Sequence, residues 1–187
     1  MNANSLFISF DSPINPMTAS ALKAEIVDAV NGREHEEAGI GLLLSSPGGD
    51  VNAGIALYNL ITAVPTPIDT YNIGSVDSIA NIVFQAGRKR FASMASRFMF
   101  HDVGFEIEKE RLETRQLEEK LSNLKNDHEI MSGILENRSA LSSEQIREFF
   151  RKQKFFHADA LLEYGLVDEV SQFRLPHGVH VRHVVFS

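Results

Sequence analysis

Two segments of this chain repeat one local order: a continuous apolar run, a glycine-containing turn, and an apolar run with helical character. The first spans Leu42 to Gly54 and the second spans Ile73 to Gly87. Continuous apolar runs are typical of parallel strands, because helices cover both faces of such a sheet. Strands that alternate with helices in this way are joined by right-handed crossovers. The sequence therefore predicts an α/β protein with a mostly parallel sheet.

Local signals divide the rest of the chain in the same manner. Asp50 is placed to cap a helix that runs through Val64, where Pro65 and Pro67 end it. The segment 179–185 alternates apolar and polar residues, as expected of an edge strand. At 187 residues the chain has the length of one domain, so we assign residues 1–187 to a single domain. We expect strands at 6–10, 39–44, 68–73, 98–101, 166–170 and 179–185, and helices at 17–30, 51–64, 78–86, 142–150 and 155–164.

Composition excludes several classes of site and partner. The chain contains no cysteine, which rules out disulfides, thiolate catalysis and cysteine-ligated metals. Its net charge of -7 argues against nucleic acid and anionic membranes as main partners. The first residues carry no basic stretch followed by a long apolar core, and no apolar run reaches the length of a membrane span. We therefore expect a cytoplasmic protein with no nucleic-acid or membrane partner.

The segment from Glu106 to Arg138 differs from the rest. It contains one glycine and no proline, and it is rich in Glu, Lys, Arg and Leu. Along it, apolar residues and one histidine recur at alternating steps of about four and three residues, which is the pattern of a seam on one long helix. The members are Leu117, Leu121, Leu124, His128, Met131 and Leu135. Such a seam fits a helix packed along its own domain and equally a helix that projects to meet another subunit.

The sequence offers a hydroxyl on a tight turn, a histidine and a Gly-Gly turn with free amides, which are the parts of a serine hydrolase. Ser78 is expected at the N-terminal end of a helix, where the dipole and unpaired amides favour developing negative charge. Ser75 is a competing nucleophile nearby. His101 ends a strand at the sheet edge where ligands bind in α/β proteins. Gly48 and Gly49 would let backbone amides approach a substrate carbonyl and form an oxyanion hole.

Each of these signals also has an ordinary structural explanation. Serine is a common helix cap, a histidine at a strand end is often only hydrogen-bonded, and Pro-Gly-Gly is a frequent tight turn. No single signal identifies catalysis. Their joint order and spacing carry the interpretation.

That joint order resembles the proteolytic subunit of the Clp protease (ClpP) family. SSPGGDVNAGIALYN is similar to the family's SPGG-x-V-x-AG segment, GSVDSIANIVFQAG to its nucleophile turn, and RFMFH to its R-x-M-x-H strand. ADALLEYGLVDEV, at residues 158–170, matches the family's tail motif. The similarity covers Leu6 to Val170, and four motifs in the right order make it specific.

The resemblance implies a fold, a reaction and a site. The fold would be the ClpP/crotonase superhelix of repeated β-β-α units, with residues 106–138 as the handle helix through which family rings meet. The reaction would be that of a serine-type endopeptidase, with an acyl-enzyme on Ser78 and His101 as the general base. The amides of Gly49 and Ile79 match the family's oxyanion hole. No metal and no cofactor is implied. The substrate would be a peptide or an unfolded polypeptide, and the protein would be a homo-oligomer.

The third triad position departs from the family pattern. The family's aspartate aligns with Gln153, counted back from Tyr164 and Gly165. Glutamine can accept the histidine N–H and orient the ring, but it cannot stabilise an imidazolium by charge. In the chymotrypsin-type triad, replacing the aspartate by asparagine lowers the rate by about four decades. Three nearby acids are candidates to substitute: Asp102, which is expected to point to the other face of its strand, Glu148 and Asp159.

Other departures concern the nucleophile turn and the chain ends. Asp77 stands before the nucleophile, where the family has a small apolar residue. Its carboxylate would oppose an oxyanion if it faced the site, or it would help to position His101. Asn81 replaces another small residue. The chain begins at the family's first strand, without the segment that contacts an unfoldase, which argues against an ATPase partner. Residues 171–187 form a tail with an additional strand-like run.

Two other functional classes stay open on the sequence. A catalytically weakened or inactive assembly or regulatory subunit is supported by Gln153 and Asp77, while the presence of both Ser78 and His101 argues against it. A crotonase-like acyl-CoA enzyme would use paired amides to stabilise a thioester enolate. That chemistry usually relies on carboxylates, which the Ser78/His101 pair does not supply. A ClpP-like serine endopeptidase is therefore the main prediction.

Overall fold

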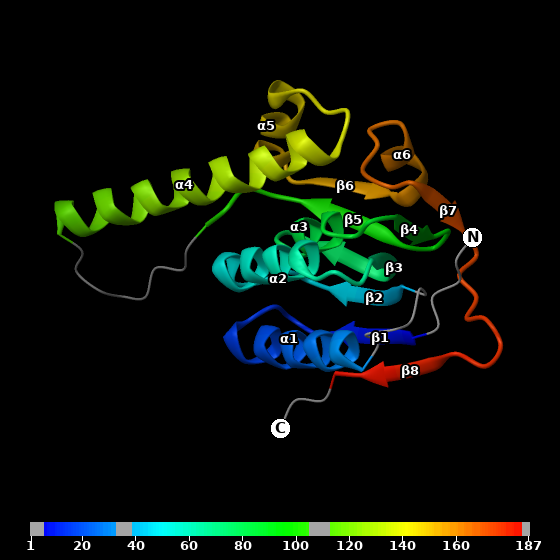
Figure 1. The fold of residues 1–187 in the computed structure, drawn as a ribbon. Coiled ribbons are helices and arrows are strands. Elements are labelled where there is room, and N and C mark those ends of the chain that lie inside the picture. The colour runs from blue at the N-terminus through cyan, green and yellow to red at the C-terminus, as the bar shows by residue number, and fades with distance from the viewer. Residues whose placement is uncertain (1–5, 33–38, 105–112, 185–187) are drawn as a thin grey trace.

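The computed structural model describes residues 6–32, 39–104 and 113–184, which form a sheet with helices packed against it (Figure 1). Within these ranges the sheet has eight strands: six follow the order β6-β5-β3-β2-β1-β8, and β4 pairs with both β3 and β7. The strands are β1 (Leu6–Asp11), β2 (Ile40–Ser46), β3 (Ile68–Asp77), β4 (Arg90–Ser93), β5 (Arg97–Phe100), β6 (Lys154–His157), β7 (Glu169–Ser171) and β8 (His180–His183). The helices are α1 (Pro16–Asn31), α2 (Val51–Ala63), α3 (Ala80–Gln85), α4 (Thr114–Arg138), α5 (Ser143–Arg151) and α6 (Ala158–Leu162).

The sheet is mostly parallel, which confirms the prediction. Among the described strands, every pair is parallel except β5 with β6. Parallel neighbours need crossover connections, and α1 and α2 supply them between β1, β2 and β3. The carboxyl ends of β2 and β3 therefore meet at one edge of the sheet. Ser46 and Asp77 are the last residues of these two strands.

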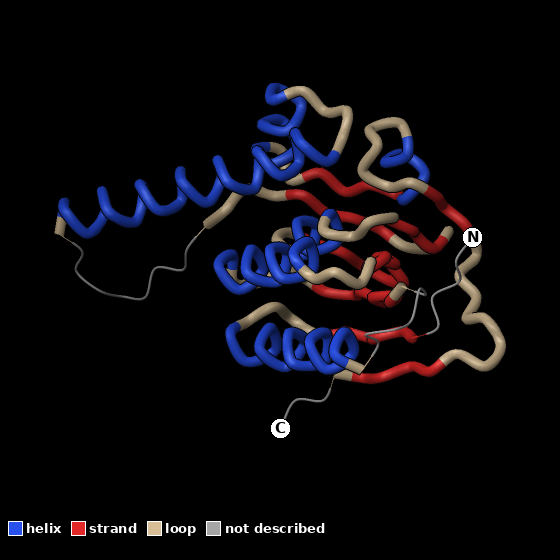
Figure 2. The backbone as a smooth tube through the Cα atoms, in the orientation of Figure 1, coloured by secondary structure: helices blue, strands red, loops and turns tan. Residues whose placement is uncertain are grey.

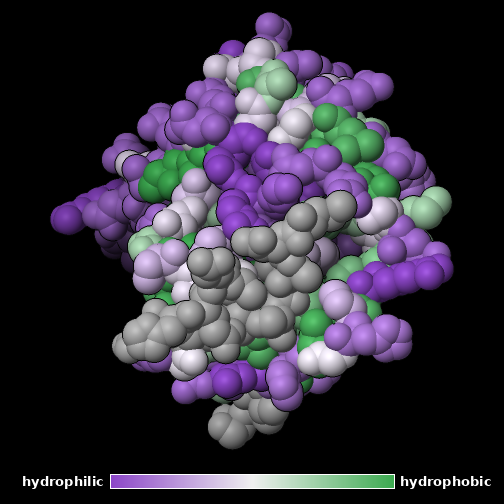
Figure 3. Space-filling view, turned by 45° about the vertical axis from the view of Figure 1, so that its right-hand side comes forward, coloured by the Kyte–Doolittle hydropathy of each residue, from purple (hydrophilic) through white to green (hydrophobic). Residues whose placement is uncertain are grey.

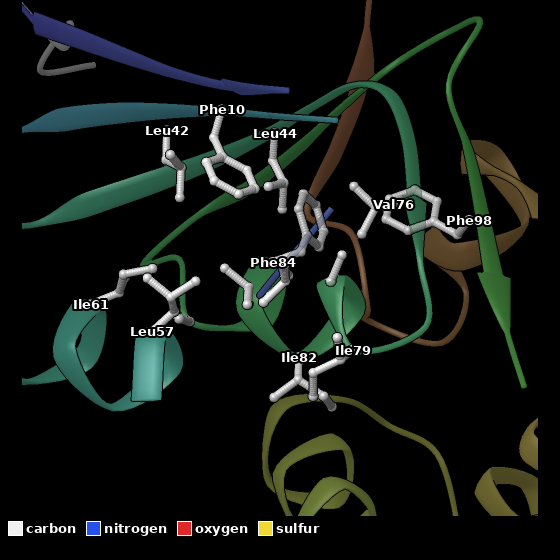
Figure 4. Close-up of a cluster of buried hydrophobic side chains, with 14 of the residues drawn as sticks. Phe10, Leu42, Leu44, Leu57, Ile61, Val76, Ile79, Ile82, Phe84 and Phe98 are labelled. Carbon is white, nitrogen blue, oxygen red and sulfur yellow. The ribbon is translucent and has the colours of Figure 1, made fainter. Parts of the chain in front are cut away.

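Helices α1, α2 and α3 lie in one layer against the sheet (Figure 1 and Figure 2). Leu57 and Ile61 of α2 and Phe84 of α3 are buried among strand side chains that include Leu42 and Leu44 (Figure 4). Burying a side chain of this size contributes roughly 1.5–3 kcal/mol. This core therefore holds the β3–α3 connection firmly against β2.

Polar side chains define where several helices begin. Asp50 caps α2 by accepting the Ala53 N–H at 2.7 Å, which confirms the predicted cap. Asn15 caps α1 with a reciprocal capping box. Ser142 and Gln145 form the predicted capping box of α5.

In two segments the type of element differs from the sequence prediction. Residues 155–164, predicted as one helix, instead contribute to β6 and the short helix α6. The cause is tertiary: β6 pairs with β5, with Lys154 beside Phe100, and this pairing outweighs the local helical pattern.

The sequence did not predict strand β4, because its four residues contain no long apolar run. The predicted stop at Gly165 is confirmed, since this residue has a φ of +65° and its N–H donates to the Leu162 carbonyl at 3.0 Å.

The long helix α4 begins later than the predicted range of 106–138. It starts at Thr114, because Glu113 has an extended backbone and acts as its N-cap. Residues 106–112 of the predicted helix lie outside the described residues. The helix ends at Arg138 as predicted.

The seam on α4 is divided between two environments. Met131 and Leu135, near its C-terminal end, are buried in the core of the domain. Its N-terminal part projects away from the sheet (Figure 1), and Leu117 and Leu121 are 45% and 51% exposed there. The C-terminal part of the seam therefore packs along its own domain, whereas the N-terminal part leaves two leucines exposed on a projecting helix.

The C-terminal tail adds strand β8 to the edge of the sheet. β8 pairs in parallel with β1, which confirms the predicted edge strand, and Arg182 on it pairs with Asp28 of α1. The face drawn in Figure 3 is largely hydrophilic, with separate hydrophobic patches. Of the helices in the described ranges, none has the length and apolar character needed to cross a membrane.

Candidate active site at the carboxyl ends of strands β2, β3 and β5

Ser78 lies on the turn between β3, which ends at Asp77, and α3, which begins at Ala80. The helix starts two residues later than predicted, so Ser78 precedes it and Ile79 takes the cap position. The reason is the Ser78 backbone, whose φ of +57° is left-handed and cannot continue into a right-handed helix. Its N–H donates to the Met99 carbonyl of β5 at 2.8 Å. Strained residues of this kind cluster at functional sites.

The turn that follows β2, residues 47–49, lies directly against the Ser78 turn. Gly48 has a φ of +87°, and a Cβ atom on it would lie 2.7 Å from the Ser78 Cβ and 2.6 Å from the Asp77 carbonyl oxygen. Only glycine permits so close an approach. Ile14, which follows β1, stabilises this turn, because its N–H donates to the Gly48 carbonyl at 2.8 Å. The structure therefore brings the two predicted turns together.

Two backbone N–H groups at this junction, those of Gly49 and Ile79, donate no hydrogen bond to any acceptor in the described ranges. Ile79 is fully buried, and buried amides are almost always paired. A Cβ atom on Gly48 would lie 3.3 Å from the Ile79 nitrogen, so this amide is close to the glycine turn. Unpaired amides beside a serine are the arrangement that stabilises a tetrahedral oxyanion.

Asn81 ties the Ser78 turn to the neighbouring strand. Its side-chain amide donates to the Ser78 carbonyl at 3.0 Å and to the Met99 carbonyl at 2.8 Å, and the residue is 2% exposed. In the sequence, Asn81 is distinguished only by standing where the Clp protease family has a small residue. Its role as a clamp depends on Met99, which is distant along the chain, and no local signal could have revealed it.

Asp77 is buried beside Ser78 and faces a cation. One of its carboxylate oxygens lies 3.9 Å from the Arg97 guanidinium. The other oxygen is buried without a hydrogen-bond partner in the part of the chain that the structure describes. Arg97 also donates to the Ser75 hydroxyl at 3.2 Å. Ser75, the competing candidate, is therefore engaged by this arginine and lies on the strand rather than on the turn.

His101 follows the last residue of β5 and is half-buried. Strand β5 runs parallel to β3 with Met99 beside Asp77, so His101 leaves the sheet next to the Ser78 turn. Its Nδ1 atom lies 2.6 Å from the main-chain carbonyl oxygen of Asp102. No hydrogen bond joins the Ser78 hydroxyl to His101 in the described part of the chain. Catalytic hydrogen bonds are often long before substrate binds.

Gln153 lies on the turn between α5 and β6, with an exposed side chain and a φ of +45°. The β5–β6 register ends with Phe100 beside Lys154, so its continuation would place His101 opposite Gln153. The main chain of Gln153 is thus near the predicted position. Its side chain, however, makes no hydrogen bond to His101 among the described residues.

The three acids considered as substitutes for the triad aspartate are placed elsewhere. Glu148 is half-buried and accepts from Lys152 at 2.9 Å and Lys154 at 3.2 Å, hydrogen bonds that lower the pKa of its carboxyl. Asp159 is exposed in the first turn of α6. The expectation that Asp102 lies on a strand and points to its other face is wrong, because β5 ends at Phe100.

The side chain of Asp102 instead contacts α4. Its Oδ1 atom accepts the Val103 N–H at 2.9 Å and lies 3.1 Å from Nδ1 of His128. His128 appeared in the sequence only as a polar member of the α4 seam. Its contact with the residue that follows His101 joins segments 26 residues apart, so the sequence pattern alone could not reveal it.

Two cavities lie outside the Ser78 turn. One, of about 360 Å³, lies between α4 and the segment after β5, and its lining includes Asp102 and His128. The other, of about 520 Å³, is distant from Ser78 and is walled by aromatic rings. Within it, Tyr71 stacks on Phe91 with ring centres 4.7 Å apart, and Phe173 of the tail contacts Tyr71 at 5.4 Å. The tail therefore forms one wall of the larger cavity.

Comparisons with known proteins agree with this architecture. The structure is similar to that of a ClpP1 mutant from Listeria monocytogenes, with a TM-score of 0.79 and 19% sequence identity over 90% of this chain and 92% of that chain. At this identity the likeness establishes the fold, which is the ClpP type predicted from the sequence. The sequence model of the Clp protease family matches residues 3–174. The chain therefore belongs to the Clp protease family.

Proposed function

We propose that this protein is a serine endopeptidase that cleaves peptide bonds through an acyl-enzyme on Ser78. Family membership supports a ClpP-like protease, and Clp protease family proteins act on peptide substrates as oligomers. The observation that carries the assignment to Ser78 is the close junction of the Ser78 turn with the glycine-bearing turn at residues 47–49. This junction joins a strained serine to the unpaired amides of Gly49 and Ile79.

In the proposed reaction, the Ser78 hydroxyl oxygen attacks the carbonyl carbon of the scissile bond. Its proton passes to Nε2 of His101, and the carbonyl oxygen becomes an oxyanion held by the N–H groups of Gly49 and Ile79. As the C–N bond breaks, the imidazolium returns the proton to the amine leaving group. Water then attacks the ester, giving its proton to His101, and releases the acid product with Ser78 restored. No cofactor or metal takes part in these steps.

The alternatives raised by the sequence have weaker support. The case for an inactive subunit rested on Gln153 and on the carboxylate of Asp77. The nearby guanidinium of Arg97 partly balances the charge of Asp77, and family membership does not favour an inactive subunit. An acyl-CoA enzyme would need a carboxylate base at the site, and we assign none.

The direct test is labelling with a fluorophosphonate probe, followed by intact mass and peptide mapping. We expect a single adduct on Ser78, no adduct in Ser78→Ala, and labelling at least about 10³-fold slower in His101→Ala. Ser75→Ala is the matched control and should label at the wild-type rate. Failure of the folded wild-type protein to react, or an adduct on Ser75, would overturn the assignment.

We also propose that the protein assembles as a homo-oligomer through α4. The support is the projecting N-terminal half of this helix, with Leu117 and Leu121 exposed on one side, together with the oligomeric habit of the family. Replacing both leucines by serine should weaken assembly while leaving the secondary structure unchanged. Light scattering measures the outcome, and a strictly monomeric wild-type protein at micromolar concentration would contradict the proposal.

A further inference from the structure

The contact between His101 and Asp102 fixes which nitrogen of the catalytic ring is free. A main-chain carbonyl oxygen can only accept a hydrogen bond, so the 2.6 Å contact requires the proton to reside on Nδ1 of His101. Nε2 is then unprotonated and can accept the serine proton. In a serine protease triad, the acid that binds Nδ1 sets this same tautomer and ring orientation.

The Asp102 carbonyl is held in place through the Asp102 side chain. Oδ1 accepts the N–H of Val103 at 2.9 Å, which closes a tight local turn, and it also contacts Nδ1 of His128 at 3.1 Å. A carboxylate oxygen accepts, so His128 is the donor in the second contact. The segment after β5 is thereby attached to α4 directly beside His101.

The ring of His128 is in turn positioned by packing. It meets the ring of Phe150, at the end of α5, with centres 5.0 Å apart and an interplanar angle of 61°. Phe150 is buried, while the His128 side chain is 25% exposed to solvent. Lys125 and Glu129 are the charged groups of α4 that line the same cavity. A polar contact this exposed adds little to stability, so its value lies in geometry.

We propose that His128 is a positioning residue for the reaction, holding Asp102 so that the Asp102 main-chain carbonyl performs the orienting role of the missing triad acid. This inference rests on the proposed serine peptidase function. It explains how His101 keeps the productive tautomer although the Gln153 side chain makes no hydrogen bond to it in the described chain. It also means that the orientation of the His101 ring depends on α4, whose N-terminal end projects from the domain.

The experiment compares fluorophosphonate labelling rates of the full-length protein in its native assembly. His128→Leu removes the donor but retains bulk, and it should label about 10- to 100-fold more slowly, the size of effect seen when a catalytic group is slightly misplaced. His128→Asn retains an N–H donor at the same distance from the backbone and should restore most of the rate. Lys125→Leu, which lines the same cavity, should label within twofold of the wild type.

Further variants separate this proposal from its competitors. Asp102→Asn keeps an acceptor oxygen for His128 and should label faster than Asp102→Leu. If Gln153→Leu slows labelling more than His128→Leu does, the glutamine orients His101 and the proposal is overturned. Equal rates for His128→Leu and the wild type would overturn it as well, whereas absence of labelling in the wild type would refute the peptidase function itself. Thermal unfolding of each variant shows whether a slow labelling rate reflects loss of folding. If His128→Leu does not fold, the labelling rate of folded His128→Asn relative to the wild type decides whether an N–H donor at this position is sufficient.

Discussion

The turn that carries Ser78 and the segment that carries His101 leave adjacent strands of one sheet, yet different kinds of contact hold them. The Ser78 turn is surrounded by buried groups: Gly48 touches it, Asn81 clamps it and Ile79 is fully enclosed. The His101 segment is held by polar contacts that water can reach. Here Asp102 bonds to a histidine of α4.

Because of this difference, we expect mutations on the two sides to affect the stability of the fold and the labelling rate of Ser78 differently. The position of Ser78 depends on the domain core, so it should persist as long as the domain is folded. The position of His101 depends, through Asp102, on the contact with His128 of α4. Changes on the Ser78 side should alter stability and labelling together, whereas changes on the His101 side should alter labelling with little effect on stability.

The largest effect is expected for Gly48→Ala. The new methyl group would overlap the Asp77 carbonyl and the Ser78 side chain, on a backbone with positive φ that alanine disfavours. We expect a loss of roughly 2–5 kcal/mol in the free energy of unfolding, together with loss of Ser78 labelling. Chemical denaturation measures the first quantity. Gly104→Ala, three residues after His101 and with open space around it, is the matched control and should retain the wild-type stability.

A smaller loss is expected for Asn81→Ala, which removes the clamp between the Ser78 turn and β5. Two buried hydrogen bonds disappear, at a cost of about 1–3 kcal/mol in the free energy of unfolding. Asn59→Ala, on the exposed side of α2, should change stability by no more than about 0.5 kcal/mol. If both variants unfold at the same denaturant concentration, the Ser78 turn does not depend on this clamp.

On the His101 side, where α4 contacts the segment after β5, Gly133→Ala should stabilise α4. A Cβ atom at this position meets nothing within 4 Å, and alanine favours a helix over glycine by about 0.5–1 kcal/mol. A protein of this length should then melt about 1–4 °C higher. A lower melting temperature would show that another subunit occupies the space beside Gly133.

The smallest effect is expected for Glu148→Gln. Hydrogen bonds from Lys152 and Lys154 lower the pKa of the Glu148 carboxyl in the folded protein, so its contribution to stability is present above the unfolded-state pKa. It is lost as the pH falls through the lower, folded-state pKa. Because the Glu148 side chain is 40% exposed and water screens its ion pairs, the wild type should exceed the variant in stability only slightly at neutral pH. Urea midpoints measured from pH 7 to pH 3 should converge at the acid end, and a gap that widens in acid would contradict this assignment.

Local chemistry explains which elements were predictable. The Asp50 cap of α2, the capping box of Ser142 and the left-handed stop at Gly165 depend on residues within a few positions of each other. Apolar runs likewise identified β1, β2 and β3. The errors at β4 and at residues 155–164 occurred because strand pairing with distant segments decided those structures.

By itself, the sequence determined the parallel α/β architecture, the family and the candidate pair Ser78 and His101, because these follow from short motifs and hydrophobic periodicity. Only the tertiary structure decided how the α4 seam is shared between the core and the surface, and which groups surround the pair. The contact of Gly48 with Ser78, the Asn81 clamp and the link from His128 to Asp102 each join residues that are separated along the chain. The first two form because the carboxyl ends of parallel strands meet at one edge, and the third forms because α4 packs beside the segment that leaves β5. No local pattern specifies either arrangement.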